Sequence, residues 1–374
     1  MRIAQVVPAG AHPDGGVVVV IAQLSVHLAR IGHNVEVWLL RPWSGEAAGA
    51  YGRELAAQNV PIIMPPAGEQ GRYAALAARD VHIVHLHSAF TPPNALLSWR
   101  LRVPYVVSPH GGYAPASLTR SAVRKTLYKH LVERRVLRHA AMQVALTDAE
   151  AEELRAFGAR GPVTVIPNGV TPPPGVDGAA FRRELGLDPG SRLLVFVGRL
   201  DVFHKGLDFL VEAVATAPGW HAALIGPEFR DGGAWLQRRA RTLGIQSRLV
   251  LPGPRHGRAL HEAFAAADLF ALTSRWEGLP MSLLEALSHG TPALVTPAVD
   301  RLVPVADADA GWVAAPQELG AVLRELEHPE PAAWRARADR ARALAARYDW
   351  TAVARRYEAA YRQVLGSAAP RSAT

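Results

Sequence analysis

The feature that most constrains this chain is a regular alternation of short apolar runs with helical stretches. In the first half the apolar runs lie at 3–8, 34–40, 60–65, 82–86, 105–108, 143–146 and 163–166. Segments with helical spacing separate them, as at 17–30. Strands that alternate with helices form βαβ units, and strands that are apolar throughout lie in parallel sheets covered on both faces. The pattern therefore predicts an α/β fold with a parallel sheet.

The same alternation restarts after the proline-rich stretch TPPPG at 171–175. The second series of apolar runs lies at 193–198, 221–226, 248–253, 268–272 and 292–296. A chain of 374 residues has enough material for two cores. We therefore expect two Rossmann-like domains that face each other across a cleft. The expected parts are a first domain at 1–170, a second at 171–350, a last helix at 351–366 and a flexible tail at 367–374. The last helix has Val353, Tyr357, Tyr361 and Val364 at helical spacing, so it needs an apolar surface to lie on.

Charge and composition narrow the class of partner only a little. The formal net charge of +8 favours an anionic partner, which could be a nucleic acid, an acidic membrane face or a phosphorylated ligand, but a solvated arginine-rich surface explains it equally well. The absence of cysteine excludes disulfides and thiolate metal sites, and fits a reducing cytoplasm. No apolar run is long enough to span a membrane, and the first residues are typical of a strand rather than a signal peptide.

Two groups of residues lie just after predicted strands, which is where anions bind to parallel sheets. In parallel sheets, ligands bind beyond the carboxyl ends of the strands. Gly15 and Gly16 lie between a strand and a helix, where glycine lets backbone N–H groups approach an anion, although a plain loop is the alternative. Arg199 and Lys205 follow the run 193–198 and suit a diphosphate, although ordinary surface charge is the alternative.

Histidines mark two further strand ends. His110 follows the run 105–108 and precedes two glycines, so it is a candidate site residue. His85 and His87 belong to another strand end, and we expect these alternating histidines to point to opposite faces of their strand. The spacing of the histidines is not that of metal ligands, and we predict no metal site.

Two glutamates stand in an otherwise apolar stretch, with seven residues between them. Pro280 suits the start of a helix, so Glu277 should lie in a loop and Glu285 one to two turns inside the helix. A buried carboxylate is costly unless something pairs with it, and carboxylates accept hydrogen bonds from ribose or sugar hydroxyls. The alternative is a pair of exposed acids near a helix N-terminus.

Taken together, these segments resemble the retaining GT-B glycosyltransferases of family GT4, also called glycosyltransferase group 1. The resemblance covers nearly the whole chain, and the number, order and spacing of its motifs are specific. The matching segments are GG at 15–16, RIGHNVEV at 30–37, SPHGG at 108–112, ALTDAEAEELRAFG at 145–158, VIPNGV at 165–170, VGRLDVFHKG at 197–206, EGLPMSLLEALSHGTPALVT at 277–296 and YDWTAVARRY at 348–357.

The resemblance implies a role for each candidate residue. The first domain would carry the acceptor side and the second the nucleotide-sugar donor, and the last helix would cross back to pack on the first domain. Glu277 would contact hydroxyls of the donor sugar, and Glu285 would bind the ribose. The implied catalytic residues are Arg199, Lys205, Glu277 and His110. The implied donor-binding residues are Gly15, Gly16, Arg199, Lys205, Glu277, Gly278, Leu279, Met281, Ser282 and Glu285, and the acceptor-side residues are His87 and His110.

The resemblance also implies the partners of the chain. The co-substrate would be a UDP-sugar or a GDP-sugar, no cofactor or metal would be required, and the acceptor would be a hydroxyl-bearing sugar, lipid-linked or small molecule rather than a nucleic acid. The chain departs from the family at two places. Pro280 stands where many members have glycine, which removes one amide donor, and the segment after VTPAV at 295–299 lacks the usual glycine pair.

Other functions remain open at this point. Glu277 and Glu285 could form the acid/base pair of a glycosidase, although that interpretation leaves Arg199 and Lys205 without a role. A GT-B nucleotide-sugar epimerase and a non-catalytic sugar-nucleotide binder are further alternatives. Nucleic-acid binding explains the charge but not the order of the motifs.

A basic segment at 120–139 raises the question of a membrane. It carries seven Lys and Arg residues and one acid, Glu133, with Val123, Leu127 and Leu131 as an apolar stripe. A basic amphipathic helix lies on anionic membranes, and the alternative is a solvated helix packed on the first domain. Because many enzymes of this family act on lipid-linked acceptors, we expect a cytoplasmic protein with weak peripheral contact at the inner face of the membrane.

Overall fold

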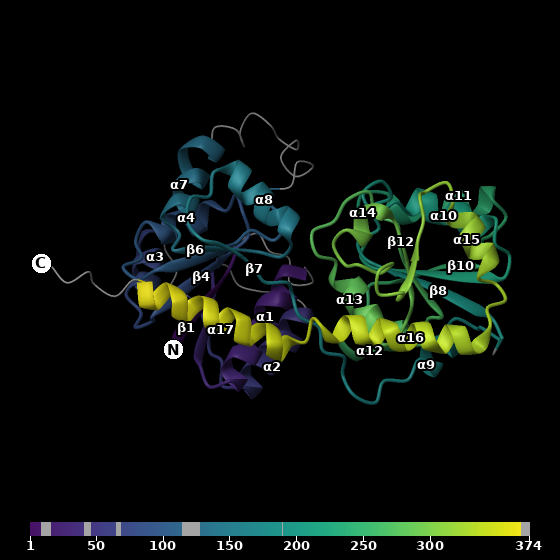
Figure 1. Ribbon diagram of the computed structural model, residues 1–374, viewed down its shortest axis with the longest axis horizontal. Coiled ribbons are helices and arrows are strands. Elements are labelled where there is room, and N and C mark those ends of the chain that lie inside the picture. Colours follow the sequence, from purple (N-terminus) through teal and green to yellow (C-terminus); the bar gives the residue numbers. More distant parts are fainter. Residues whose placement is uncertain (9–15, 41–45, 65–68, 114–127, 189, 368–374) are drawn as a thin grey trace, which may run out of the picture. The chain divides into compact units, whose positions relative to one another are not determined.

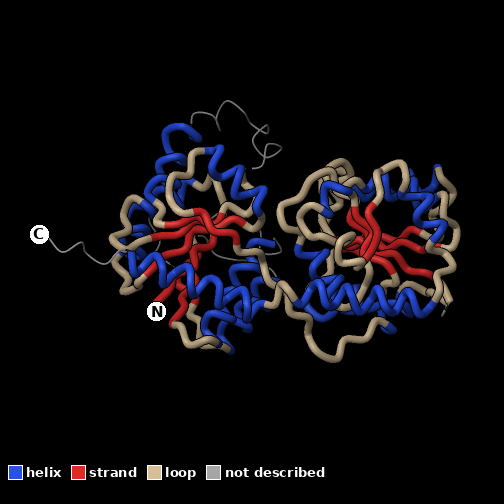
Figure 2. Tube along the Cα trace, in the orientation of Figure 1, coloured by secondary structure: helices blue, strands red, loops and turns tan. Residues whose placement is uncertain are grey.

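The structure is a computed structural model of residues 1–374, which describes the chain except at 9–15, 41–45, 65–68, 114–127, 189 and 368–374. The chain forms two compact units. Unit 1 comprises Met1–Gly169 and Trp350–Thr374, and unit 2 comprises Val170–Asp349. Each unit has a parallel sheet with helices on both faces (Figures 1 and 2), which is the architecture that the alternation predicts.

The sheet of unit 1 has seven strands in the order β3-β2-β1-β4-β5-β6-β7. The strands are β1 Arg2–Val7, β2 Asn34–Leu39, β3 Ile62–Ile63, β4 Ile83–His87, β5 Tyr105–Ser108, β6 Met142–Ala145 and β7 Val163–Val165. The helices are α1 Gly16–Arg30, α2 Glu46–Ala57, α3 Glu69–Ala77, α4 Pro92–Ser98, the π-helix η1 Lys129–Glu133, α7 Arg134–His139, α8 Asp148–Phe157 and α17 Trp350–Ser367. The strand order reverses between β1 and β4, so the ends of these two strands flank a switch point.

The two faces of this sheet are covered by different parts of the chain. Side chains of α3, α4, α7 and α8 join one face in a single apolar core. On the other face α17, the last long helix, packs on α1 (Figure 1). The stripe that α17 buries is Trp350, Val353, Ala354, Tyr357, Ala360, Tyr361 and Val364. Helix α17 is therefore part of the first unit, and the tail predicted after it lies, from residue 368 on, outside the described residues.

Unit 2 repeats the design with six strands in the order β10-β9-β8-β11-β12-β13. The strands are β8 Arg192–Val197, β9 Trp220–Ile225, β10 Leu249–Gly253, β11 Leu269–Leu272, β12 Ala293–Val295 and β13 Gly311–Val313. The helices are α9 Ala179–Glu184, α10 Leu207–Ala215, α11 Gly232–Thr242, α12 Gly257–Ala266, α13 Met281–Ser288, α14 Pro297–Asp300, α15 Leu319–Glu325 and α16 Pro331–Ala346. The switch point of this sheet lies between β8 and β11.

The fold class predicted from the sequence is confirmed, with two differences in the strands. The run at 60–65 forms only the two-residue strand β3, because Pro61 directly precedes it and a proline has no N–H to donate to a sheet. The edge strand β13 was missed, because its three residues follow a segment with no strand pattern.

Candidate functional site

The switch point of unit 2 is built from the loops that follow β8 and β11. The loop after β8 carries Arg199 and Lys205 and ends at Gly206, which has a φ of 60°. A Cβ at Gly206 would lie 2.0 Å from the carbonyl oxygen of Thr273, so only glycine lets the two loops approach this closely. The Thr273 hydroxyl donates a hydrogen bond to the Gly206 carbonyl oxygen at 2.9 Å. The two loops are therefore held together at the backbone level.

Lys205 and Glu277 form an ion pair at this junction. Lys205 Nζ lies 2.6 Å from Glu277 Oε1, and the two side chains are 14% and 9% exposed. The buried Ser274 hydroxyl donates to the same carboxylate oxygen at 2.6 Å. Oε2 of Glu277 accepts no hydrogen bond from any described residue. The sequence analysis placed Lys205 and Glu277 in one site with separate roles, and did not foresee that they would pair in the free protein.

Ring contacts stiffen the loop that precedes Glu277. The His204 ring stacks on Trp276 with centroids 4.5 Å apart, and His204 Nε2 lies 2.9 Å from the Trp276 carbonyl oxygen. Arg275 donates to both carboxylate oxygens of Asp208, at 2.9 and 2.7 Å. These contacts fix the loop after β11 to the first turn of α10, so Lys205 and Glu277 are held by a rigid frame.

Arg199 and Glu285 lie at the same edge of the sheet as this pair. Arg199 is exposed, and its guanidinium lies 5.0 Å from the centre of the Phe229 ring. Glu277 lies in the loop before α13 and Glu285 is the fifth residue of the helix, as the sequence predicts. Burial raises the pKa of Glu285 to about 7, and no described residue donates a hydrogen bond to its carboxylate. An acid that is desolvated without a partner is a candidate ligand-binding group.

The remaining donor-site candidates surround the start of α13. Gly278 is exposed, Leu279 is buried, and Met281 and Ser282 open the helix. The N-cap residue is Pro280, whose side chain makes no capping hydrogen bond. The first turn of a helix has N–H groups without intrahelical acceptors, so this end of α13 suits an anion.

In unit 1 the two predicted histidines are in contact. His110 Nε2 lies 2.8 Å from His87 Nδ1, and the two rings stack with centroids 5.1 Å apart. The expectation that His85 and His87 point to opposite faces is wrong, because their centroids are only 4.0 Å apart. Residues two positions apart on a strand share a face. Burial lowers the pKa of His110 to about 4 and that of His87 well below its usual value.

The backbone at His110 is in a rarely occupied conformation. His110 has a φ of 52°, and Ser88 and Phe90 after β4 have φ values of 71° and 55°. Non-glycine residues in this region are strained, and such residues cluster at functional sites. The buried Glu150 holds the loop in place, because it accepts hydrogen bonds from the N–H groups of Gly111 at 2.5 Å and Leu146 at 2.7 Å.

Some residues of this site were not found from the sequence. Ser274, Glu150, Gln5 and Tyr361 contact the candidate residues or their loops, and none was singled out for a site. A signal existed for Gln5, which is a polar residue inside an otherwise apolar strand. Tyr361 lies in the buried stripe of α17, and its helical spacing predicts burial but no role in a site.

Two other predictions rest partly on residues outside the described ranges. Gly15 is not described, and Gly16 is the exposed first residue of α1. In the basic segment 120–139, residues 120–127 are not described. In the part that is, Leu131 is 65% exposed, whereas Glu133 is buried and accepts hydrogen bonds from the Tyr113 hydroxyl and the Phe90 N–H. Among the described helices, none combines the length and the apolar character that a membrane span requires.

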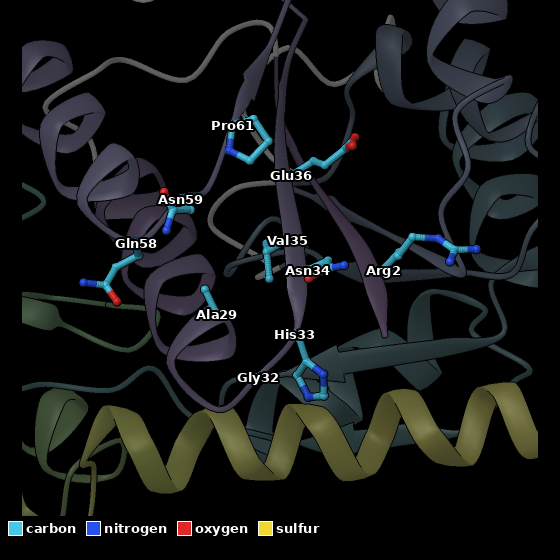
Figure 3. Close-up of a pocket in the computed structure, with 10 residues that line it drawn as sticks. All are labelled: Arg2, Ala29, Gly32, His33, Asn34, Val35, Glu36, Gln58, Asn59 and Pro61. Carbon is cyan, nitrogen blue, oxygen red and sulfur yellow. The ribbon is translucent and has the colours of Figure 1, made fainter.

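A surface hollow of about 510 Å³ lies elsewhere in unit 1 (Figure 3). Arg2 and Asn34 line it and open strands β1 and β2, so it lies at the amino ends of the strands. Its charged groups are already paired, Arg2 with Asp80 and Glu36 with Arg79. The hollow is therefore at the opposite edge of the sheet from His87 and His110. Within the described residues, no three His, Asp or Glu side chains converge as metal ligands.

Both halves of the chain match known protein families. Residues 14–172 match Glycosyltransferase Family 4, and residues 177–340 match Glycosyl transferases group 1. A D-inositol 3-phosphate glycosyltransferase of Nocardia farcinica is 30% identical over 322 residues, which cover 76% of this chain and 70% of the relative. A second such enzyme, from Segniliparus rotundus, is 31% identical over 74% of this chain, and the match spans 65% of that relative's length.

Solved structures show the same fold. Anabaena HepE in complex with UDP and glucose has a TM-score of 0.78 at 21% identity, over 97% of this chain and 100% of that one. Sucrose-phosphate synthase of Thermosynechococcus elongatus has a TM-score of 0.77 at 20% identity, over 98% of this chain and 100% of that one. With both halves matched in order, the chain belongs to the group 1 glycosyltransferases, with a Family 4 domain in its first half.

Proposed function

We propose that the chain transfers a sugar from a nucleoside-diphosphate sugar to a hydroxyl acceptor, with retention of anomeric configuration, in the synthesis of a glycan or glycolipid. The observation that carries this proposal is the Lys205–Glu277 pair at the switch point of unit 2, beside the exposed Arg199. Cations at the carboxyl ends of parallel strands suit a diphosphate, and a neighbouring carboxylate suits sugar hydroxyls.

Each residue of the donor site then has a distinct task. Lys205 and Arg199 neutralise the diphosphate, with help from the N–H groups at the start of α13. Glu277 accepts a hydrogen bond from a sugar hydroxyl through Oε2, while Oε1 remains bonded to Ser274. Glu285 accepts hydrogen bonds from the ribose, which stabilise the ionised carboxylate that the free protein disfavours.

Charge development explains why these groups accelerate the reaction. Breaking the bond between sugar and phosphate leaves positive charge on the sugar and negative charge on the diphosphate. Arg199 and Lys205 act on the leaving group, and preorganised electrostatic stabilisation of this kind usually contributes more to catalysis than any other single effect. A same-face displacement, in which the donor phosphate helps to deprotonate the acceptor, requires no nucleophile from the protein. We also assign His110 to the catalytic set and His87 to the acceptor side, on the ground that their two rings are in contact.

Relatives support a uridine or guanosine diphosphate sugar as the donor. HepE was solved with UDP-glucose. A mannosyltransferase of Komagataeibacter xylinus, 29% identical over 77% of this chain and 73% of its own length, is named for GDP-mannose and a diphosphopolyprenol-linked acceptor. We propose a sugar or lipid-linked hydroxyl acceptor on the same ground.

The donor site is tested by thermal unfolding with UDP, GDP, ADP and dTDP. A ligand at about 100 times its dissociation constant adds about 2.7 kcal/mol of stability, which is readily measured. One nucleotide should stabilise the wild type, and Lys205→Ala and Arg199→Ala should each lose most of that effect. Arg241→Ala is the matched control, because it removes one positive charge from an exposed position on α11. If no nucleotide stabilises the folded wild type, the donor site is wrongly assigned.

Transfer itself is tested with the nucleotide sugar chosen by that screen. Proton NMR of the product with a panel of hydroxyl acceptors should show a new glycoside whose anomeric configuration equals that of the donor. Inversion would contradict retention. Conversion of the donor into an isomeric nucleotide sugar without an acceptor would instead indicate an epimerase.

A further inference from the structure

A chain of hydrogen bonds runs from His110 to the last helix, entirely within unit 1. His110 Nε2 lies 2.8 Å from His87 Nδ1, and His87 Nε2 lies 2.8 Å from Gln5 Oε1. Gln5 Nε2 donates to the Tyr361 hydroxyl at 3.2 Å. That hydroxyl lies 2.7 Å from His85 Nδ1. The chain thus links the site to a residue 356 positions away from Gln5 in the sequence.

The strands and α17 explain how these side chains meet. Gln5 of β1 pairs in register with His85 of β4, so both side chains lie on one face of the sheet. His87 is two positions further along β4 and shares that face. Tyr361 comes from α17, which covers the same face. Gln5, His85, His87 and Tyr361 are all 0% exposed, so no water competes for these hydrogen bonds.

The direction of each hydrogen bond follows from the amide of Gln5. The amide nitrogen faces Tyr361, so the amide oxygen faces His87 and can only accept. His87 must then carry its proton on Nε2. A neutral imidazole has one N–H, which leaves Nδ1 of His87 as an acceptor. His110 must therefore donate from Nε2, and its own Nδ1 is left bare.

This placement of protons requires neutral rings, and burial supplies that condition. Desolvation lowers the pKa of His87 well below its usual value and that of His110 to about 4. Rotation of the Gln5 amide by half a turn would reverse every bond and place a proton on Nδ1 of His110. The orientation of this amide therefore decides whether His110 offers an acceptor or a donor.

We propose that Gln5, oriented by Tyr361, fixes the tautomers of His87 and His110, so that His110 presents a bare Nδ1 as a hydrogen-bond acceptor. Gln5, His87 and Tyr361 are positioning residues that act through His110. No described residue donates to Nδ1 of His110, so this atom is available to a substrate. A bare nitrogen accepts from a hydroxyl and rejects a carbonyl or phosphate oxygen. This last step rests on the proposed function, in which hydroxyl-bearing sugars are the substrates.

The tautomer is measured directly by nitrogen NMR of protein labelled with ¹⁵N-histidine. The signal of His110 is assigned by its loss in His110→Asn. We expect the proton of His110 on Nε2 and a bare Nδ1 in the wild type. A proton on Nδ1 would overturn the proposal. This readout does not involve sugar transfer, so the expected tautomer in a protein without transferase activity would count against the proposed function alone.

Tyr361→Phe tests the role of the last helix with a minimal change. It removes only the hydroxyl that holds the Gln5 amide, so the amide can turn and His110 should show a mixture of tautomers. We expect kcat to fall about tenfold with the donor KM unchanged, because substrate contacts remain while the reacting geometry is lost in part of the population.

The matched control is Tyr357→Phe. Tyr357 lies one turn earlier on α17 and is nearly as buried as Tyr361, but its hydroxyl makes no hydrogen bond to Gln5, His87 or His110. This variant should keep the wild-type tautomer and kcat. If Tyr361→Phe behaves as Tyr357→Phe does in both measurements, the proposal fails. An equal loss of stability in the two variants would not save the proposal, because the tautomer and kcat are both measured on folded protein.

Discussion

Glu285→Gln should stabilise the ligand-free protein at alkaline pH, although it removes a residue of the proposed donor site. Burial raises the pKa of the Glu285 carboxyl from its ordinary 4.5 to about 7, and desolvation is the cause. The ionised carboxylate therefore destabilises the folded protein when no ligand is bound. A neutral amide of nearly the same shape avoids this cost.

The size of the effect follows from the two pKa values. A folded pKa above the unfolded value contributes stability that is complete below pH 4.5 and is lost as the pH rises through about 7. Each tenfold difference in proton affinity is worth about 1.36 kcal/mol, so the wild type should lose about 2 kcal/mol between about pH 5.5 and about pH 8.5 from this group. Because the side chain keeps some contact with water, we expect about 1 to 2 kcal/mol.

The measurement is urea unfolding of wild type and Glu285→Gln at both pH values. The stability of the variant relative to wild type should rise by the stated amount between the acidic and the alkaline condition. Glu325→Gln, which removes a carboxylate from an exposed position on α15, should show no such rise. A relative stability of Glu285→Gln that does not depend on pH would refute the reasoning. The same variant should also lose nucleotide stabilisation.

Three further predictions concern the frame of the site and the membrane. Lys205→Met leaves the Glu277 carboxylate, which is 9% exposed, without its cation, and should lower the free energy of unfolding in urea by about 3 kcal/mol. Adding Glu277→Gln to this variant should recover part of that loss. A loss in the double variant that equals the sum of the two single losses would contradict the pairing. Gly206→Ala would place a Cβ 2.0 Å from a backbone oxygen at a φ of 60°, and should lower the free energy of unfolding by about 3 kcal/mol or more. The control Gly186→Ala, at a φ of 64° with open space around it, should lower it by only about 1 kcal/mol. Equal losses in the two variants would argue against the close approach of the loops at Gly206. If 120–139 contacts membranes, the protein should float with anionic vesicles at low salt, and recovery in the soluble fraction would count against it.

Local patterns in the sequence were sufficient for the layout of each unit. Apolar runs separated by helical stretches predicted parallel sheets, and such sheets bind ligands at the carboxyl ends of their strands. Arg199 and Lys205 after β8 were singled out by that rule alone, and Glu277 before α13 by its place in an otherwise apolar stretch. The family resemblance added their roles, which local pattern does not specify.

Tertiary structure decided which of these residues meet. Lys205 and Glu277 are 72 positions apart, and only the adjacency of β8 and β11 brings them to 2.6 Å. The alternation of side chains along β4 put His85 and His87 on one face, and the strand after it brought His110 to them.

The last helix shows most clearly what the sequence determines and what the tertiary structure decides. Its spacing showed that Tyr357 and Tyr361 share a buried stripe, but not that the Tyr361 hydroxyl meets Gln5 of the first strand. Periodicity reports which face of an element is buried, because burial repeats with the helix or strand. The partner of a buried polar group depends on how distant elements pack, and the sequence by itself carries no local record of that.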